Sequence, residues 1–148
     1  MRCRGVTAML RKFAGPYAAG ALAALLTSIV LWVAVRARLG ALFDVELGKL
    51  FAGVLDPHGL GWRVLEGSLF ALALPLARGR GLSPVRAGLL ISLLPSLREL
   101  FLRLPSAGYG MLGVQLGALT PVVVLAANAL WGWFLGQFST RAGLEGGG

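Results

Sequence analysis

Residues 13–35 contain no charged side chain and lie between a basic segment and Arg36. About twenty apolar residues in a helix cross a hydrocarbon core of roughly 30 Å, so this run is long enough to span a bilayer. Because lipid offers no hydrogen bonds, only helices and closed barrels span it. The sequence lacks the alternating strands of about ten residues that a membrane barrel needs. We therefore expect an all-α fold, a polytopic integral membrane helical bundle.

The composition agrees with a lipid environment. The chain has 148 residues, of which 57% are hydrophobic and 14% are charged. Soluble domains carry roughly 25% charged residues, so this chain is short of the charge that a water-facing surface needs. We interpret residues 13–138 as a single transmembrane domain in the cell membrane. Residues 1–12 form a basic N-terminal tail, and residues 139–148 are expected to be a disordered, Gly-rich tail.

Four transmembrane helices are predicted from the apolar runs, at about residues 13–35, 62–77, 84–104 and 109–137. Pro16 would lie in the first turn of the first helix, where a missing N–H costs little. Ser83 and Pro84 are typical of an N-cap and a first helical position, and they would begin the third helix. Pro95 should kink that third helix.

Residues 39–55 have a different pattern. Their apolar side chains fall on one helical face, whereas Glu46 and Lys49 fall on the other. Such a segment is too polar to span, and we expect one interfacial amphipathic helix lying along the membrane surface. Asp56-Pro57-His58-Gly59 would then end this helix and place His58 in a solvent-facing loop.

The net charge of +8 bears on orientation and partners. The dense N-terminal basic cluster favours a topology with both termini cytoplasmic. In that topology the following basic residues should contact anionic lipid headgroups: Arg2, Arg4, Arg11, Lys12, Arg78 and Arg80. Nucleic acid is not an expected partner, because the basic residues flank apolar runs instead of lining one soluble face.

Ionisable residues inside the predicted spans are few and costly, which makes them candidates for function. Glu66, Arg98 and Glu99 fall at similar depths on the side opposite the termini, and Gln115 falls at the same level. Glu66 and Arg98 match best in depth and charge, so we predict that they form an ion pair. One interpretation is an internal salt bridge, with Arg63 and Arg103 reaching to the headgroups. The other is an ion or polar-ligand site open to the outside.

Small residues in the last predicted span indicate close helix packing. Gly113, Gly117, Gly132 and Gly136, with Asn128, would share one face of a helix over 109–137. Such spacing lets two helices approach closely in lipid. It serves either packing within the chain, which we favour, or self-association.

Motifs for catalysis or cofactor binding are lacking. Cys3 is the only cysteine and His58 the only histidine, so no haem or zinc ligand set is expected. We expect no catalytic residue, metal or cofactor. The sequence favours a structural, accessory or assembly component of the membrane, with self-association or a membrane-protein partner. The alternative is a small oligomeric channel or transporter that uses the polar cluster. An integral membrane enzyme is the least favoured class.

Overall fold

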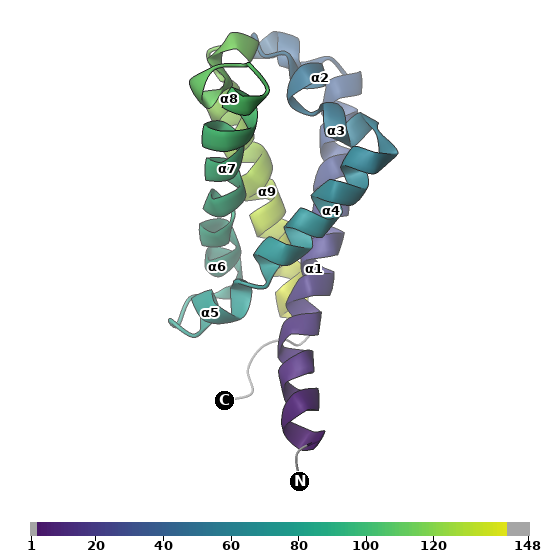
Figure 1. Ribbon diagram of the computed structural model, residues 1–148, viewed down its shortest axis with the longest axis vertical. Helices are drawn as coiled ribbons and strands as arrows, with labels where there is room; N and C mark the ends of the chain where they lie inside the picture. Colours follow the sequence, from purple (N-terminus) through teal and green to yellow (C-terminus); the bar gives the residue numbers. More distant parts are fainter. Residues whose placement is uncertain (1–2, 142–148) are drawn as a thin grey trace.

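The computed structural model describes the backbone of residues 3–141, with side chains from residue 13 onward except Leu55. Four segments lie side by side along one axis (Figure 1). They are α1 (Cys3–Arg36), α4 (Pro57–Ala71) with α5 (Leu74–Arg78), the run of α6 (Pro84–Ile91), α7 (Leu93–Arg98), η2 (Glu99–Arg103) and α8 (Leu104–Ser106), and α9 (Thr120–Arg141). The other elements are η1 (Leu39–Leu42), α2 (Leu47–Leu50), α3 (Ala52–Leu55) and η3 (Met111–Leu116). No strand occurs among residues 3–141.

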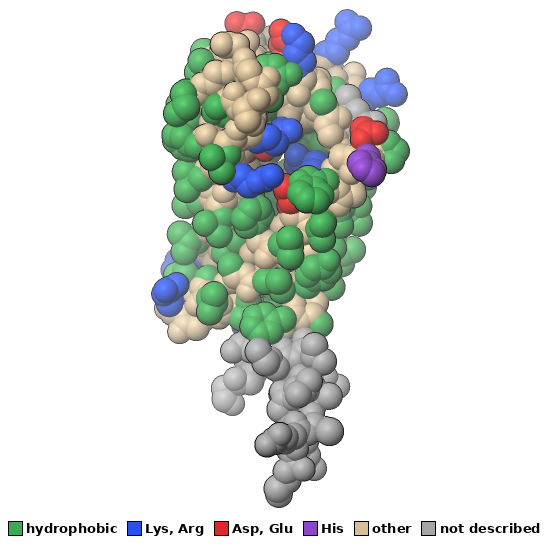
Figure 2. All heavy atoms as spheres, in the orientation of Figure 1, with side chains coloured by type: hydrophobic (Ala, Val, Ile, Leu, Met, Phe, Trp, Pro, Cys, Tyr) green, Lys and Arg blue, Asp and Glu red, His purple; other side chains and the backbone are tan. Residues whose placement is uncertain are grey.

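Three helical stretches are long and apolar enough to cross a membrane. They are Phe13–Arg36, Pro57–Arg78 and Thr120–Arg141. Large apolar side chains are exposed on the outside of the bundle, among them Leu22, Ile29, Val33, Leu69, Leu76 and Val122. Figure 2 shows hydrophobic side chains over most of the visible face. Soluble monomers rarely expose so large an apolar surface. The expected membrane helical bundle is therefore confirmed, with three helices of spanning length instead of four.

The third predicted helix, over 84–104, is interrupted. It begins as predicted, since the Ser83 hydroxyl accepts a hydrogen bond from the backbone N–H of Arg86 and Pro84 follows the cap. The α6 helix then ends at Ile91, before Pro95. Pro95 has no N–H for the carbonyl four residues earlier, which disrupts the helix at this point. The predicted kink at Pro95 is thus a break between α6 and α7, and no uninterrupted spanning helix forms.

Two serines stabilise this break. The Ser92 hydroxyl donates to the carbonyl oxygen of Leu89 at 2.7 Å, and the Ser96 hydroxyl donates to the carbonyl oxygen of Ser92 at 2.8 Å. Beyond α7 the backbone widens into a π-helical turn, η2. Turns of this kind occur often at functional sites. Here η2 contains Glu99 and Arg103.

The second spanning stretch begins earlier than the predicted 62–77. The Asp56 carboxylate accepts a hydrogen bond from the backbone N–H of Gly59 at 2.9 Å, and Pro57 stands at the first helical position. An acidic N-cap followed by proline is a strong helix start. The prediction of a loop at His58 is therefore wrong, because this exposed residue lies in the first turn of α4.

The predicted amphipathic helix over 39–55 is not continuous. It consists of the short helices η1, α2 and α3, which we call the distal cap because it lies at the end of the bundle opposite the start of α1 (Figure 1). Arg38 and Asp44 adopt positive φ angles of 54° and 49°, which interrupt a right-handed helix. Val45, Leu47, Leu50, Phe51 and Val54 are buried. The apolar face thus covers the bundle core.

The last predicted span, over 109–137, is also corrected. Residues 109–119 are irregular apart from η3, and α9 begins at Thr120. Gly113 and Gly117 adopt φ angles of 70° and 136°, and Leu112 adopts 60°. Such angles are incompatible with an α-helix. Gly113 and Gly117 therefore do not share a helix face with Gly132 and Gly136.

The remaining two glycines of that set bring α9 against α6. A Cβ atom added at Gly132 would lie 2.9 Å from the carbonyl carbon of Gly88, and one at Gly136 would lie 2.9 Å from the carbonyl oxygen of Pro84. The absence of side chains therefore allows the two backbones to touch, as small residues do in membrane bundles. This contact lies within the chain.

The first and last helices extend into the segments that were predicted to be tails. The α1 helix begins at Cys3, so Pro16 lies inside it and not in its first turn. The α9 helix continues to Arg141, so the prediction of disorder from residue 139 is wrong for Ser139–Arg141. Residues 142–148 lie outside the described residues. So do Arg2 and the side chains of Arg4, Arg11 and Lys12, on which the predicted headgroup contacts depend.

Candidate functional site

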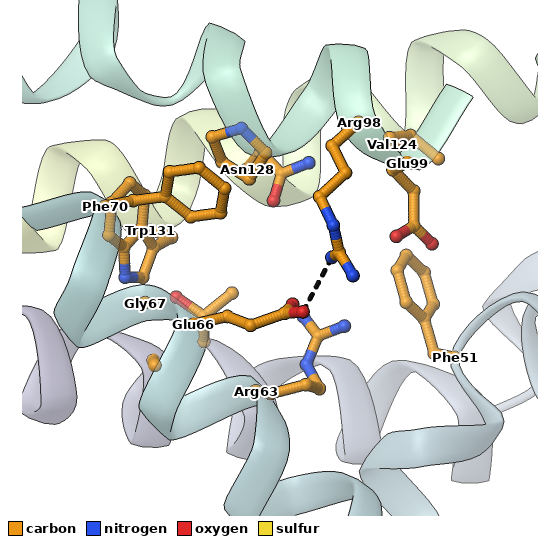
Figure 3. Close-up of a pocket in the computed structure, with 13 residues that line it drawn as sticks. Phe51, Arg63, Glu66, Gly67, Phe70, Arg98, Glu99, Val124, Asn128 and Trp131 are labelled. Atoms are coloured by element: carbon orange, nitrogen blue, oxygen red, sulfur yellow. Dashed lines mark ion pairs between the residues drawn. The ribbon is translucent and has the colours of Figure 1, made fainter. Parts of the chain in front are cut away.

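A polar cavity lies between the four segments in the half of the bundle next to the distal cap. Figure 3 shows side chains from α4, α7, η2 and α9 converging on it, with Phe51 from the distal cap. The cavity has a volume of about 60 Å³. One water needs roughly 10–15 Å³ by this measure, so a few waters or one small polar group would fit. We call it the distal cavity.

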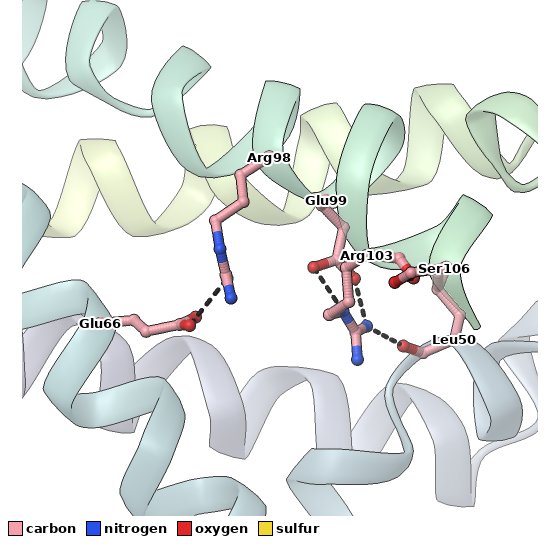
Figure 4. Close-up of polar contacts among 6 residues, drawn as sticks. All are labelled: Leu50, Glu66, Arg98, Glu99, Arg103 and Ser106. Atoms are coloured by element: carbon pink, nitrogen blue, oxygen red, sulfur yellow. Dashed lines mark hydrogen bonds and ion pairs between the residues drawn. The ribbon is translucent and has the colours of Figure 1, made fainter.

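Glu66 and Arg98 form the predicted ion pair across this cavity. Oε1 of Glu66 lies 2.7 Å from Nη1 of Arg98, and the pair joins α4 to α7 (Figure 4). Their side chains are 23% and 38% exposed in the isolated chain. Glu66 lies within a stretch of spanning length and Arg98 lies beside it in the bundle, so each charge would be costly alone and is tolerated when paired.

Glu99 and Arg103 form a second ion pair, one turn apart along η2. Both carboxylate oxygens of Glu99 accept hydrogen bonds from the Arg103 guanidinium, and the Nε bond measures 2.7 Å. Nη2 of Arg103 also donates to the main-chain carbonyl oxygen of Leu50 at 3.0 Å (Figure 4). The expectation that Arg103 reaches out to the headgroups is therefore wrong, because its guanidinium turns back to the distal cap.

Arg63 also turns inward, contrary to the expectation that it reaches the headgroups. It lines the distal cavity, and its guanidinium carbon lies 5.9 Å from the centre of the Phe51 ring. An arginine over an aromatic face gains a cation–π attraction. Within the described chain no carboxylate forms an ion pair with Arg63. Glu66 and Glu99, which line the same cavity, attract the Arg63 guanidinium at longer range, but each of them is in contact with another arginine.

Two neutral polar groups of the cavity also lack partners. The Thr27 side chain, from α1, is 2% exposed, and its hydroxyl has no hydrogen bond within residues 13–141. Asn128, from α9, lines the same cavity, and no hydrogen bond of its amide is found in the described part of the chain. Buried polar groups are nearly always satisfied, so the Thr27 hydroxyl is available to a partner in the cavity. The buried hydroxyls of Ser28 and Thr120 also lack a hydrogen bond among the described residues, but neither lines the cavity.

Gln115 does not join this cluster. It lies in η3, beside a second hollow lined by residues 40–41, 44–46 and 114–118. The prediction that Gln115 lies at the same depth as Glu66, Arg98 and Glu99 is wrong, because Gln115 is not on a spanning helix. In the adjoining distal cap, Lys49 pairs with Glu46 at 2.5 Å, and this hydrogen bond raises the pKa of Lys49. Both side chains are largely exposed, so the pair adds little stability.

The half of the bundle away from the distal cap is closed and apolar. Its core is a cluster of buried side chains, including Ala19, Ala23, Ala71, Leu74, Ala87, Ile91 and Leu135. At the floor of the distal cavity, Nε1 of Trp131 donates to the carbonyl oxygen of Gly20 at 3.3 Å. This bond ties α9 to α1 and satisfies the indole. The cavity therefore ends at this level and does not continue as a polar path.

Sequence reasoning missed three members of the site. The sequence does not single out Thr27, and it predicts a headgroup contact for Arg63 and a helix-packing role for Asn128. A threonine or asparagine inside an apolar run is a weak signal, because most such residues bond locally. Only the positions of the neighbouring helices show that these three side chains border one space.

Comparisons with protein-family models, with curated proteins and with solved structures found no match to this chain. The class of the protein therefore rests on its own architecture. The chain forms a membrane helical bundle with a polar cavity in one half and a closed apolar core in the other.

Proposed function

We propose that this chain is a four-span accessory protein of the cell membrane that binds a small polar ligand in its distal cavity. The single observation that carries this proposal is that three side chains without a hydrogen bond among the described residues line one space, namely Arg63, Thr27 and Asn128. A purely structural polar cluster would be expected to satisfy its own members.

The fourth crossing is the interrupted run α6–α8. This run lies beside α9 and extends over the same length of the bundle in Figure 1. The Ser92 and Ser96 hydroxyls donate to main-chain carbonyls next to the break, and such side-chain hydrogen bonds help interrupted helices to be tolerated in lipid. Four crossings return α9 to the side on which α1 begins, and the N-terminal basic cluster favours the cytoplasm for that side. The distal cavity then faces the outer leaflet.

The closed core opposes the alternative, a small channel or transporter. A conducting path needs polar groups or water through both halves, whereas buried alanine, leucine and isoleucine fill the half nearer the termini. The α9 glycines pack on α6 within the chain, so they do not supply a free face for oligomerisation. A partner protein, if one binds, would therefore contact other surfaces.

Cysteine accessibility tests the proposal. In a chain with Cys3 replaced by Ser, Thr27→Cys should react with a small, membrane-impermeant thiol reagent added from outside. Ser28→Cys is the matched control, because Ser28 is equally buried (2% exposed) but does not line the cavity. Thr27→Cys should stay unreactive to reagent added from the cytoplasmic side.

A flux measurement complements the labelling. Purified protein in sealed vesicles should pass no ions in a dye assay under an imposed potential. Equal labelling of Thr27→Cys from both sides, together with measurable flux, would favour the channel. No labelling from either side would overturn the idea of an open site.

A further inference from the structure

Three guanidinium groups (Arg63, Arg98 and the adjoining Arg103) and two carboxylates lie in and beside the distal cavity, so positive charge is in excess by one. Glu66 pairs with Arg98, and Glu99 pairs with Arg103, so both carboxylates of the cavity have partners. Arg63 also lines the cavity and has no ion pair within the described chain. A charge removed from water and left unpaired is costly, so this guanidinium favours an anionic ligand.

The other unsatisfied groups suit the same kind of ligand. The Thr27 hydroxyl and the Asn128 amide both donate hydrogen bonds, and neither has an acceptor among the described residues. A guanidinium binds phosphate and carboxylate oxygens through two parallel N–H groups. A phosphodiester, with two charged oxygens and further ester oxygens, can accept from all three side chains at once. The small volume of the cavity limits what enters to a group of about that size.

The position of the hollow indicates where such a group would come from. Figure 2 views the molecule across its long axis, and charged side chains surround a hollow on this side of the bundle. Hydrophobic side chains cover the face below the hollow. The distal cap covers the end of the bundle instead (Figure 1). The opening is thus on the side of the bundle next to the distal cap, at the level where lipid headgroups meet the outer water.

The depth of Arg63 agrees with a lipid headgroup. Arg63 lies six residues after Pro57, the start of α4, which is roughly 9 Å along the helix at 1.5 Å per residue. The headgroup region of one leaflet is about 5–8 Å thick. Trp62, its neighbour, is 58% exposed, and exposed tryptophans are typical of the membrane interface.

We propose that the distal cavity binds the phosphate group of a membrane phospholipid, which enters sideways between α4 and α7 while its acyl chains lie on the apolar face below. This inference rests on the proposed function, because it names the ligand of the same site. Arg63 would pair with the phosphate, and Thr27 and Asn128 would donate to its oxygens.

Lipid binding to the purified full chain in a non-ionic detergent tests this proposal. Three probes with different parts of the ligand are compared: phosphatidylglycerol, diacylglycerol with the same acyl chains, and glycerol phosphate. Native mass spectrometry counts the retained molecules, and a titration gives each dissociation constant. We expect one phosphatidylglycerol per chain and at least tenfold weaker binding of the other two probes.

Single variants test whether phosphatidylglycerol binds in the distal cavity. Arg63→Gln should weaken phosphatidylglycerol binding by about tenfold or more, which corresponds to about 1.4 kcal/mol. Arg36→Gln is the matched control, because Arg36 is exposed near the same end of the bundle but outside the cavity. Thr27→Val provides a second variant that keeps the fold, since it removes a buried hydroxyl without a partner. It should weaken binding while leaving thermal stability unchanged or raised.

Several results would contradict the proposal that the ligand is a phospholipid. Equal binding of diacylglycerol would mean that the phosphate is not recognised, and equal binding of glycerol phosphate would identify a soluble anion as the ligand. Equal losses in Arg63→Gln and Arg36→Gln would indicate general surface attraction. If Thr27→Cys is still labelled from outside in these cases, the cavity is a site and only its ligand is wrong. If that labelling also fails, the proposed function fails too.

Discussion

Arg103 donates a 3.0 Å hydrogen bond to the main-chain carbonyl of Leu50, while the same guanidinium pairs with Glu99. This side chain therefore joins the distal cap to the interrupted third segment. The carbonyl of Leu50 is near the end of a short helix, α2, where backbone acceptors lack helical partners. The position of the cap thus depends on a contact with the bundle and not on the membrane surface alone.

Replacing Arg103 should loosen the distal cap. Arg103→Gln leaves the 13%-exposed Glu99 side chain without its cation and removes the donor to Leu50. We expect a loss of about 2 kcal/mol in unfolding free energy, measured by thermal unfolding in detergent. Arg103→Lys keeps the charge but not the forked geometry, so it should lose less. Unchanged melting of Arg103→Gln would show that the tie does not stabilise the fold.

Glu66 and Arg98 should behave as a coupled pair. Glu66→Gln or Arg98→Gln alone leaves one charge without its partner, and each should cost about 2 kcal/mol, less than for a fully buried pair because both side chains are partly exposed. The double variant should be more stable than the sum of the two losses predicts. Melting temperatures of all four proteins in one detergent provide the measurement. Strictly additive losses would contradict a direct interaction.

The glycine contact between α6 and α9 gives a prediction with an internal control. Gly132→Ala places a Cβ 2.9 Å from the Gly88 carbonyl carbon, so it should destabilise the bundle by about 1–3 kcal/mol. Gly61→Ala has nothing within 4 Å of the new Cβ and lies inside α4. It should be neutral or stabilising by up to about 1 kcal/mol, through helix propensity. A reversed order of the two melting temperatures would place the close packing elsewhere.

Labelling from each side of the membrane distinguishes four crossings from three. With Cys3 replaced by Ser, single cysteines at Arg80 and at position 145 should both react only from the cytoplasmic side. Cysteines at Lys49 and Ala107 should react only from outside. Reaction at position 145 from outside, with Arg80 still cytoplasmic, would mean that the run α6–α8 does not cross.

Hydrophobic runs and their bounding charges predicted much of this protein. The helical class, the lipid environment and the helix start at Ser83-Pro84 follow from patterns of adjacent residues, because hydropathy and capping act over one or a few turns. The pair of Glu66 and Arg98 was also predictable, since antiparallel neighbours place residues of equal depth together. These results depend on distance along the chain, which a sequence records directly.

The breaks and the cavity were decided by tertiary structure. Residues 109–117 read as apolar helix, yet Gly113 and Gly117 adopt backbone angles that the packing against neighbouring segments selects. The rotation of each helix about its axis also decides whether Arg63, Thr27 and Asn128 face lipid, protein or a common space. In lipid, hydropathy discriminates weakly between these directions, because an apolar side chain is equally well placed facing lipid or a neighbouring helix. Contacts such as Gly88 with Gly132 and Arg103 with Leu50 determine how each helix is rotated.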